Sequence, residues 1–213
     1  MNVTRESMRL YAITDRSWLG SKSLARQVEE VLQNGATFLQ IREKELSDAD
    51  FLAETKLLKE IAARYHVPFV VNDNISVALA AGADGVHVGQ SDIVNKDVRS
   101  LIGPDKILGI SANTVGTALA AQSAGADYIG VGAVFGTTTK KDAQNLSVAQ
   151  LKEICQAVSI PVVAIGGITA AKIGRLAGSG IDGVAVISAI FAQPDPGAAT
   201  RQLLKLSGEM LKR

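Results

Sequence analysis

The sequence predicts a (β/α)8 barrel, in which eight parallel strands alternate with helices and close into one sheet. Two observations lead to this prediction. Eight short apolar runs recur along the chain, each followed by polar or glycine-rich residues. The segments between several of them carry apolar residues at helical spacing, and strands that alternate with helices are typical of a parallel sheet. The apolar runs span residues 8–13, 37–42, 68–72, 84–88, 107–111, 127–131, 161–165 and 183–187.

Helical spacing is clearest in three of the intervening segments. Their expected buried stripes are Leu24, Val28, Val31 and Leu32, then Leu52, Leu57, Leu58 and Ile61, and later Leu151, Ile154 and Val158. A doubly wound sheet is the alternative, but it usually shows a glycine fingerprint after its first strand. Here the first strand leads into Thr14-Asp15-Arg16, which is no such fingerprint.

A local repeat supports the alternating pattern. In each copy a glycine ends a helix and the next strand follows at once. The copies are Ala81-Gly-Ala-Asp-Gly85, Ala124-Gly-Ala-Asp127 and Gly178-Ser-Gly-Ile-Asp-Gly183. Nothing marks a linker, so we expect one domain over residues 1–213, a length that α/β barrels often reach.

Composition narrows the class of protein. The chain is 47% hydrophobic and carries a net charge of +1, so a large core is expected and a global field for nucleic acid or membrane surfaces is not. Its 4% aromatic content also argues against a base-stacking surface. One cysteine fits a reducing cytoplasm, and charged residues interrupt any signal-peptide core within residues 1–20. We expect a soluble cytoplasmic protein with small-molecule partners. The sequence does not decide between a monomer and a homo-oligomer.

Polar residues are expected where the second strand ends, because active sites of such barrels lie at the carboxyl ends of the strands. Gln40, Arg42 and Lys44 are spaced to share one face of an extended segment, with Leu39 and Ile41 on the other. This triplet points to the barrel mouth. The alternative is an ordinary exposed charged loop.

Two carboxylates follow neighbouring strands. Asp73 comes after the third strand, next to Asn72, and Asp92 lies in the loop after the fourth. Together they could bind Mg²⁺, which often keeps waters and takes further oxygens from substrate phosphate. Asp73 could equally cap the helix that follows, since aspartate is a favoured first residue there.

The sequence offers two places for anions. One is charged: the loop after the sixth strand carries three threonines and then Lys140, which Arg42 and Lys44 could join at the mouth. The other is neutral, where Gly167 and Ser188 follow the seventh and eighth strands and backbone amides suit a phosphate monoester. The charged site suits a diphosphate. Without an evident protein nucleophile, diphosphate is expected to be a leaving group.

Three further residues are expected to be structural. His87 lies within the fourth strand, where a lone histidine more often supports the fold than catalyses. His66 precedes the third strand and should be at the surface. Cys155 lies beside the stripe of Leu151 and Ile154, so we interpret it as a packing residue rather than a nucleophile.

Taken in order, one motif per strand, the residues resemble the thiamine-phosphate synthase family from about Leu10 to Phe191. An ordered set of this kind is far more specific than a single motif. The motifs are Gln40-x-Arg42-x-Lys44, Asn72-Asp73, Gly85-Val-His-Val-Gly-Gln-x-Asp92, Gly109-Ile-Ser111, Gly130-Val-Gly132 with Thr137-Thr-Thr-Lys-Lys-Asp142, Ala164-Ile-Gly-Gly-Ile168 and Val186-Ile-Ser188.

The resemblance implies that a pyrimidine diphosphate is joined to a thiazole phosphate, with release of diphosphate and with Mg²⁺ as cofactor. The residues implied for the pyrimidine diphosphate are Gln40, Ile41, Arg42, Glu43, Lys44, Asn72, Ser111 and Lys140, of which Lys140, Arg42 and Ser111 would be catalytic. Those implied for the thiazole phosphate are Thr137, Thr138, Thr139, Gly167, Ile187 and Ser188. Asp73 and Asp92 would hold the metal.

The chain departs from the family pattern at a few positions. Ala133 and Gly136 stand where the family commonly has proline, and Asn113 stands where it often has histidine. Two other functions compete. A thiazole tautomerase of the same fold tends to lack the charged ligands and to rely on a histidine, and a silent phosphate-binding barrel would need no leaving-group site.

Overall fold

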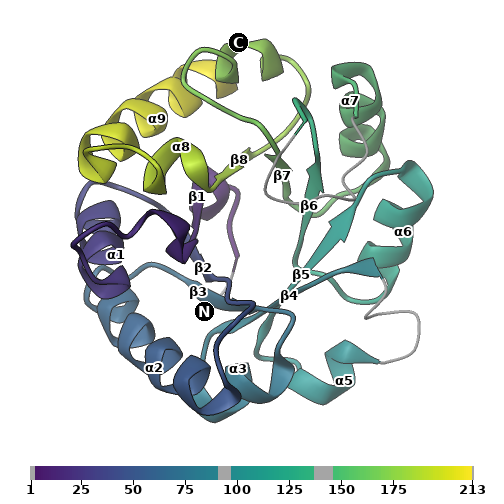
Figure 1. Cartoon of the computed structure of the whole chain (residues 1–213). Helices are drawn as coiled ribbons and strands as arrows, with labels where there is room; N and C mark the ends of the chain where they lie inside the picture. The colour runs from purple at the N-terminus through teal and green to yellow at the C-terminus, as the bar shows by residue number, and fades with distance from the viewer. Residues whose placement is uncertain (1–2, 91–96, 137–145, 213) are drawn as a thin grey trace.

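The computed structural model describes residues 3–90, 97–136 and 146–212. Eight parallel strands form a closed barrel in sequence order, with β1 paired to both β2 and β8, and helices surround it (Figure 1). The predicted (β/α)8 fold is confirmed. The strands are β1 Leu10–Ile13, β2 Phe38–Ile41, β3 Phe69–Asn72, β4 Gly85–Val88, β5 Ile107–Ala112, β6 Tyr128–Gly132, β7 Val162–Ile165 and β8 Gly183–Val186.

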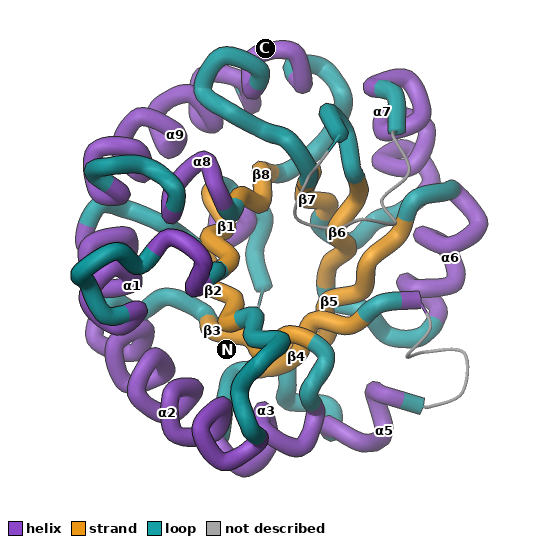
Figure 2. Tube along the Cα trace, in the orientation of Figure 1, coloured by secondary structure: helices purple, strands orange, loops and turns teal. Residues whose placement is uncertain are grey.

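The helices form the outer ring, and Figure 2 shows how loops carry the chain between this ring and the strands. The α-helices are α1 Leu24–Gln33, α2 Asp48–Arg64, α3 Ile75–Ala81, α5 Val98–Ile102, α6 Val115–Ser123, α7 Val148–Ala157, α8 Ser188–Phe191 and α9 Pro196–Leu211. The short 3-10 helices are η1 Glu6–Met8, η2 Arg16–Trp18 and η3 Ile173–Leu176. None of the helices in the described ranges is long and apolar enough to cross a membrane.

Side-chain caps explain where the helices begin. The residue before each of seven α-helices accepts a hydrogen bond from an amide in the first turn, which satisfies a donor that the helix cannot. These caps are Ser23, Ser47, Asn74, Asp97, Thr114, Ser147 and Asp195.

Two apolar layers hold the fold. The larger one packs the outward faces of the strands against the helices, and the smaller one fills the barrel interior with residues that include Tyr11, Phe38 and Tyr128. The two-residue period of the strands separates these layers, as Leu39 and Ile41 face the helices while Phe38 faces inward. One predicted stripe residue is wrong: Leu57 is 48% exposed, because it lies one position off the face on which Leu58 is buried.

The aspartates of the Gly-Ala-Asp and Gly-Ile-Asp repeats link neighbouring strands at their amino ends. In each copy, the aspartate before an even-numbered strand accepts a hydrogen bond from an amide near the start of the preceding odd-numbered strand. Asp84 binds the amide of Phe69 at 2.9 Å, Asp127 that of Leu108 at 2.7 Å, and Asp182 that of Val162 at 2.9 Å. Thr37 does the same for Leu10. These contacts fix neighbouring strands in register.

Candidate active site

The side chains predicted for substrate binding lie, where they are described, at or beyond the carboxyl ends of the strands. Their elements are β2, β3, β5 and the turns after β7 and β8, so they surround one end of the barrel. They are Gln40, Ile41, Arg42, Glu43, Lys44, Asn72, Asp73, Ser111, Gly167, Ile187 and Ser188. Thr137, Thr138, Thr139, Lys140 and Asp92 lie outside the described residues.

The turn after β2 is fixed from β1. Thr14, which is fully buried, receives a hydrogen bond from the amide of Arg42 at 3.0 Å, and its own amide donates to the carbonyl of Gln40. Arg42 is half-buried, whereas Lys44 is exposed. The backbone beneath Arg42 is therefore held firmly, while Lys44 stands in solvent.

Glu43 faces a cation of this chain. Its carboxylate accepts a hydrogen bond from Nε of Arg16 at 3.0 Å, and Arg16 also pairs with Glu54. Burial raises the pKa of Glu43 above its usual range, and Arg16 opposes that effect. Arg16 thus anchors the turn after β1 to the turn after β2. Ile41 packs outward against the helices.

Asp73 adopts a positive φ of 59° immediately after β3. Its amide donates to the carbonyl of His87 at 2.9 Å, and its Oδ2 accepts from Nδ2 of Asn72 at 2.6 Å. Asn74, and not Asp73, caps α3 by accepting from the amide of Val77. The capping alternative for Asp73 is therefore wrong, and its carboxylate lies at the barrel mouth beside Asn72.

Ser111 is held by two side chains from β4 and the loop after it. Its Oγ lies 3.0 Å from Nε2 of His87, and its backbone carbonyl accepts from Nε2 of Gln90 at 2.5 Å. His87 was expected to be only structural, yet it contacts the hydroxyl of a predicted catalytic residue.

The barrel interior carries polar contacts that the motifs did not indicate, between Gln40, two tyrosines and His87. Gln40 is only 2% exposed and donates from Nε2 to the hydroxyl of Tyr11 at 2.5 Å. The hydroxyl of Tyr11 lies 2.8 Å from that of Tyr128, which lies 3.0 Å from Nδ1 of His87. The two-residue period of the first and sixth strands could have placed both tyrosines inside, but not in contact.

The turns after β6 and β7 are joined by their backbones. The amide of Val134 donates to Ile165 at 3.0 Å, and that of Phe135 donates to Gly166 at 3.1 Å. Gly167 follows with a φ of 64°. A Cβ atom there would lie 2.1 Å from the carbonyl oxygen of Gly136, so only glycine fits this close approach.

The turn after β8 leads into a short helix. Ile187 is the residue before α8, and Ser188 is its first residue. The first amides of a helix have no partner within it, and the loops after the seventh and eighth strands with a short extra helix form the recurrent phosphate site of such barrels.

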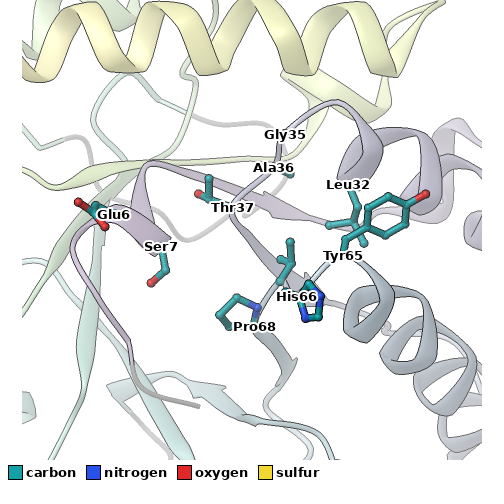
Figure 3. Close-up of a pocket in the computed structure, with 10 residues that line it drawn as sticks. Glu6, Ser7, Leu32, Gly35, Ala36, Thr37, Tyr65, His66 and Pro68 are labelled. Carbon is teal, nitrogen blue, oxygen red and sulfur yellow. The ribbon is translucent and has the colours of Figure 1, made fainter.

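A separate cavity of about 510 Å³ lies at the opposite end of the barrel (Figure 3). Its lining comes from η1 and from the residues that precede β2 and β3, so it opens at the amino ends of the strands. His66, exposed as expected, is one of these residues. Cys155 is also remote from the mouth, and burial raises the pKa of its thiol to about 12, as suits a packing residue.

A closed barrel with a glycine turn after β7, a short helix after β8 and polar side chains at the same end defines an enzyme barrel of the phosphate-binding class. The family model for thiamine monophosphate synthase matches residues 10–190. The chain therefore belongs to the thiamine monophosphate synthase family, and it is an enzyme of the transferase class.

Individual relatives agree along almost the whole chain. The thiamine-phosphate synthase of Ruminiclostridium cellulolyticum is 49% identical over 197 residues, covering 92% of this chain and 94% of that protein. That of Clostridium tetani is 47% identical over 194 residues, covering 91% and 93%. The structure of thiamine phosphate pyrophosphorylase from Pyrococcus furiosus has a TM-score of 0.89 and 39% identity, covering 97% of this chain and 98% of that one.

Proposed function

We propose that this enzyme joins 4-amino-2-methyl-5-(diphosphooxymethyl)pyrimidine to a thiazole phosphate and releases thiamine phosphate and diphosphate. Family membership and the names of the relatives support the overall reaction. The observation that carries the assignment is the division of the mouth, where polar side chains lie at the carboxyl ends of β2, β3 and β5 while a glycine turn and a short helix follow β7 and β8.

The side chains after β2, β3 and β5 suit the pyrimidine diphosphate. Arg42 would be one cation of this site, and the hydrogen bond from its backbone amide to buried Thr14 supports that role because it holds the turn that carries the side chain. Ser111 can donate a hydroxyl hydrogen to an anionic oxygen, and Asn72 can donate an amide hydrogen. Lys44, from the same turn after β2, and Lys140, from the loop after β6, would add positive charge. Two or three cations on one diphosphate stabilise the negative charge that grows as it departs.

Asp73 fits a magnesium ion by the chemistry of its surroundings. Asn74 performs the helix capping, and Asn72 holds one carboxylate oxygen of Asp73. No three His, Cys, Asp or Glu side chains of the described ranges gather as a metal cluster, but Mg²⁺ usually needs only one or two carboxylates when substrate phosphate and waters supply the rest. Asp73 and Asp92 would hold it. The ion, when bound, would neutralise charge on the diphosphate oxygens.

The thiazole phosphate would bind on the other side of the mouth. Gly167 and Ser188 would present backbone amides and one hydroxyl to the phosphate, and Thr137, Thr138 and Thr139 would be further ligands of it. This arrangement would direct the thiazole nitrogen towards the pyrimidine. The phosphate would serve as a handle, since it takes no part in the bonds that change.

The chemistry would be a dissociative substitution. The bond between the pyrimidine methylene carbon and the diphosphate oxygen breaks, and its electron pair leaves with diphosphate. The thiazole nitrogen then gives its lone pair to the resulting methylene cation, so no proton transfer is needed. The protein would act through positioning and charge stabilisation. This mechanism fits the polar groups at the mouth, which include the carboxylate of Asp73, the amide of Asn72 and the hydroxyl of Ser111.

One assay separates this reaction from its competitors. Purified enzyme with both substrates should release diphosphate and form thiamine phosphate in equal amounts, and excess chelator should abolish both until Mg²⁺ is restored. A thiazole tautomerase would convert its thiazole phosphate without any diphosphate release. A silent binding barrel would bind phosphate esters and turn over neither. Full turnover in excess chelator would refute the metal requirement.

A further inference from the structure

Five polar side chains form one hydrogen-bonded chain across the barrel interior, from β2 to β5. Its contacts are Gln40 to Tyr11 at 2.5 Å, Tyr11 to Tyr128 at 2.8 Å, Tyr128 to His87 at 3.0 Å and His87 to Ser111 at 3.0 Å. These four contacts connect five residues, each on a different strand. Gln40 and Ser111, the two ends of this chain, are the members that were predicted to bind substrate.

One direction of donation is favoured, because the reverse order would leave the single hydrogen of the buried Tyr11 hydroxyl without a partner in the chain. Gln40 donates to Tyr11, so the hydrogen of Tyr11 is available for Tyr128, and that of Tyr128 for Nδ1 of His87. A neutral His87 that accepts at Nδ1 carries its hydrogen on Nε2 and donates it to Ser111. Ser111 then accepts a hydrogen bond from His87, so its own hydroxyl hydrogen is left to donate to an acceptor at the barrel mouth.

Burial keeps the two phenols as donors. Tyr11 is 1% exposed and Tyr128 is fully buried, and desolvation raises the pKa of each well above its ordinary value. Neither phenol therefore ionises in the range where the enzyme would work. Edge-to-face contacts with Phe38 hold both rings, at centroid distances of 4.6 Å and 5.4 Å.

Two glycines make room for the chain. A Cβ atom at Gly109 would lie 2.3 Å from the hydroxyl of Tyr128 and 2.6 Å from Nδ1 of His87, so a larger residue would occupy the place where these two groups meet. A Cβ atom at Gly130 would lie 3.2 Å from Cε1 of His87. Both glycines belong to family motifs of the sequence, but neither glycine was itself assigned a substrate contact.

We propose that Tyr11, Tyr128 and His87 are positioning residues, which turn the hydroxyl of Ser111 into an obligate hydrogen-bond donor towards the departing diphosphate. The proposal rests on the proposed function, which places that diphosphate at Ser111. A donor that is already aligned stabilises charge that develops in the transition state without reorganisation. These residues therefore act on the chemical step through Ser111.

The first test is a double-mutant cycle with Tyr128→Phe and Ser111→Ala. Tyr128→Phe keeps the ring and removes the link to His87, so kcat for diphosphate release should fall about tenfold while KM for the thiazole phosphate changes by less than about twofold. In the Ser111→Ala background the same substitution should have almost no further effect on kcat. Tyr65→Phe removes a phenol at the opposite end of the barrel and is the matched control, expected to retain normal kinetics.

Substitutions of His87 test the direction of the chain. His87→Gln can still offer an amide hydrogen near the position of Nε2, so it should keep a substantial part of kcat. His87→Asn can reach Tyr128 but not Ser111, and should behave like Ser111→Ala. Thermal unfolding and thiazole phosphate binding are measured on every variant, and Tyr11→Phe is a second route to the same break if Tyr128→Phe does not fold.

Several results would overturn the proposal. If the effects of Tyr128→Phe and Ser111→Ala multiply, the tyrosine acts through packing and not through Ser111. Equal kcat values for His87→Asn and His87→Gln, or an unchanged kcat in both Tyr→Phe variants, would contradict it as well. A wild-type enzyme that releases no diphosphate would instead refute the proposed function, so the two failures are distinguishable.

Discussion

Replacement of Gly167 by alanine tests whether the turn after β7 shapes the thiazole phosphate site. The substitution adds one carbon atom at a residue whose φ is 64°. That atom would lie 2.1 Å from the carbonyl oxygen of Gly136 and 2.7 Å from that of Phe135. Both oxygens belong to backbone, so the segment that enters the 137–145 loop must move away. We expect weaker binding of the thiazole phosphate and little change for the pyrimidine diphosphate.

The magnitude has two parts. A left-handed backbone costs an alanine roughly 1–2 kcal/mol, and relief of a steric overlap in a packed region typically costs about 1–3 kcal/mol. Gly178→Ala isolates the first part, because Gly178 has a φ of 72° and no atom within 4 Å of its added carbon. The difference between the variants, about 1–3 kcal/mol, corresponds to about 5- to 150-fold in affinity if it is all expressed in binding.

Titration calorimetry of both variants with each substrate measures this difference, and thermal unfolding reports the backbone strain that they share. The expected result is a selective loss of thiazole phosphate affinity in Gly167→Ala, with Gly178→Ala close to the wild type in binding. If both substrates lost affinity equally, or if the two variants bound alike, the turn after β7 would not shape this site.

The remaining predictions concern single side chains. Ser188→Ala should weaken thiazole phosphate binding by about 1.5–3 kcal/mol and leave pyrimidine diphosphate affinity intact, as separate titrations would show. Lys140→Ala should lower the single-turnover rate by about 10²–10³ with a smaller effect on binding, whereas Lys141→Ala, the neighbouring control, should be nearly silent. A normal rate at saturation would contradict that role. Because burial raises the pKa of Cys155 to about 12, its alkylation rate should still rise tenfold per pH unit through pH 10, and a plateau near pH 9 would argue against it.

The sequence was sufficient for the barrel because the relevant signals are local. The alternation of apolar runs with helical stripes, and glycines such as Gly82 at the end of α3, depend on neighbours within a few residues. The same holds for the mouth, since the fold places every strand end on one side. Asp73 shows the limit of such reasoning. The sequence favours helix capping and metal binding equally for this residue, and the structure shows that Asn74 caps α3.

The interactions that the sequence did not reveal join distant parts of the chain. Tyr11 and Tyr128 are 117 positions apart, and Gln40 is 29 positions from Tyr11. Which inward-facing groups meet depends on the stagger of the strands around the barrel, and that stagger is not written in any one segment. Glu43 is a similar case, because its partner Arg16 comes from a different loop.

The polar chain also bears on why the barrel interior is not wholly apolar. Buried hydroxyl, amide and imidazole groups are costly unless each has a partner, and an apolar filling of similar shape is often no less stable. In this barrel each inner polar side chain of the network has a hydrogen-bond partner within 3.0 Å, and these side chains are Gln40, Tyr11, Tyr128 and His87. Stability alone therefore gives little reason to keep them. Our proposal explains their arrangement by its end point: the chain delivers a single aligned donor at Ser111, where the proposed departure of diphosphate has the most to gain from one.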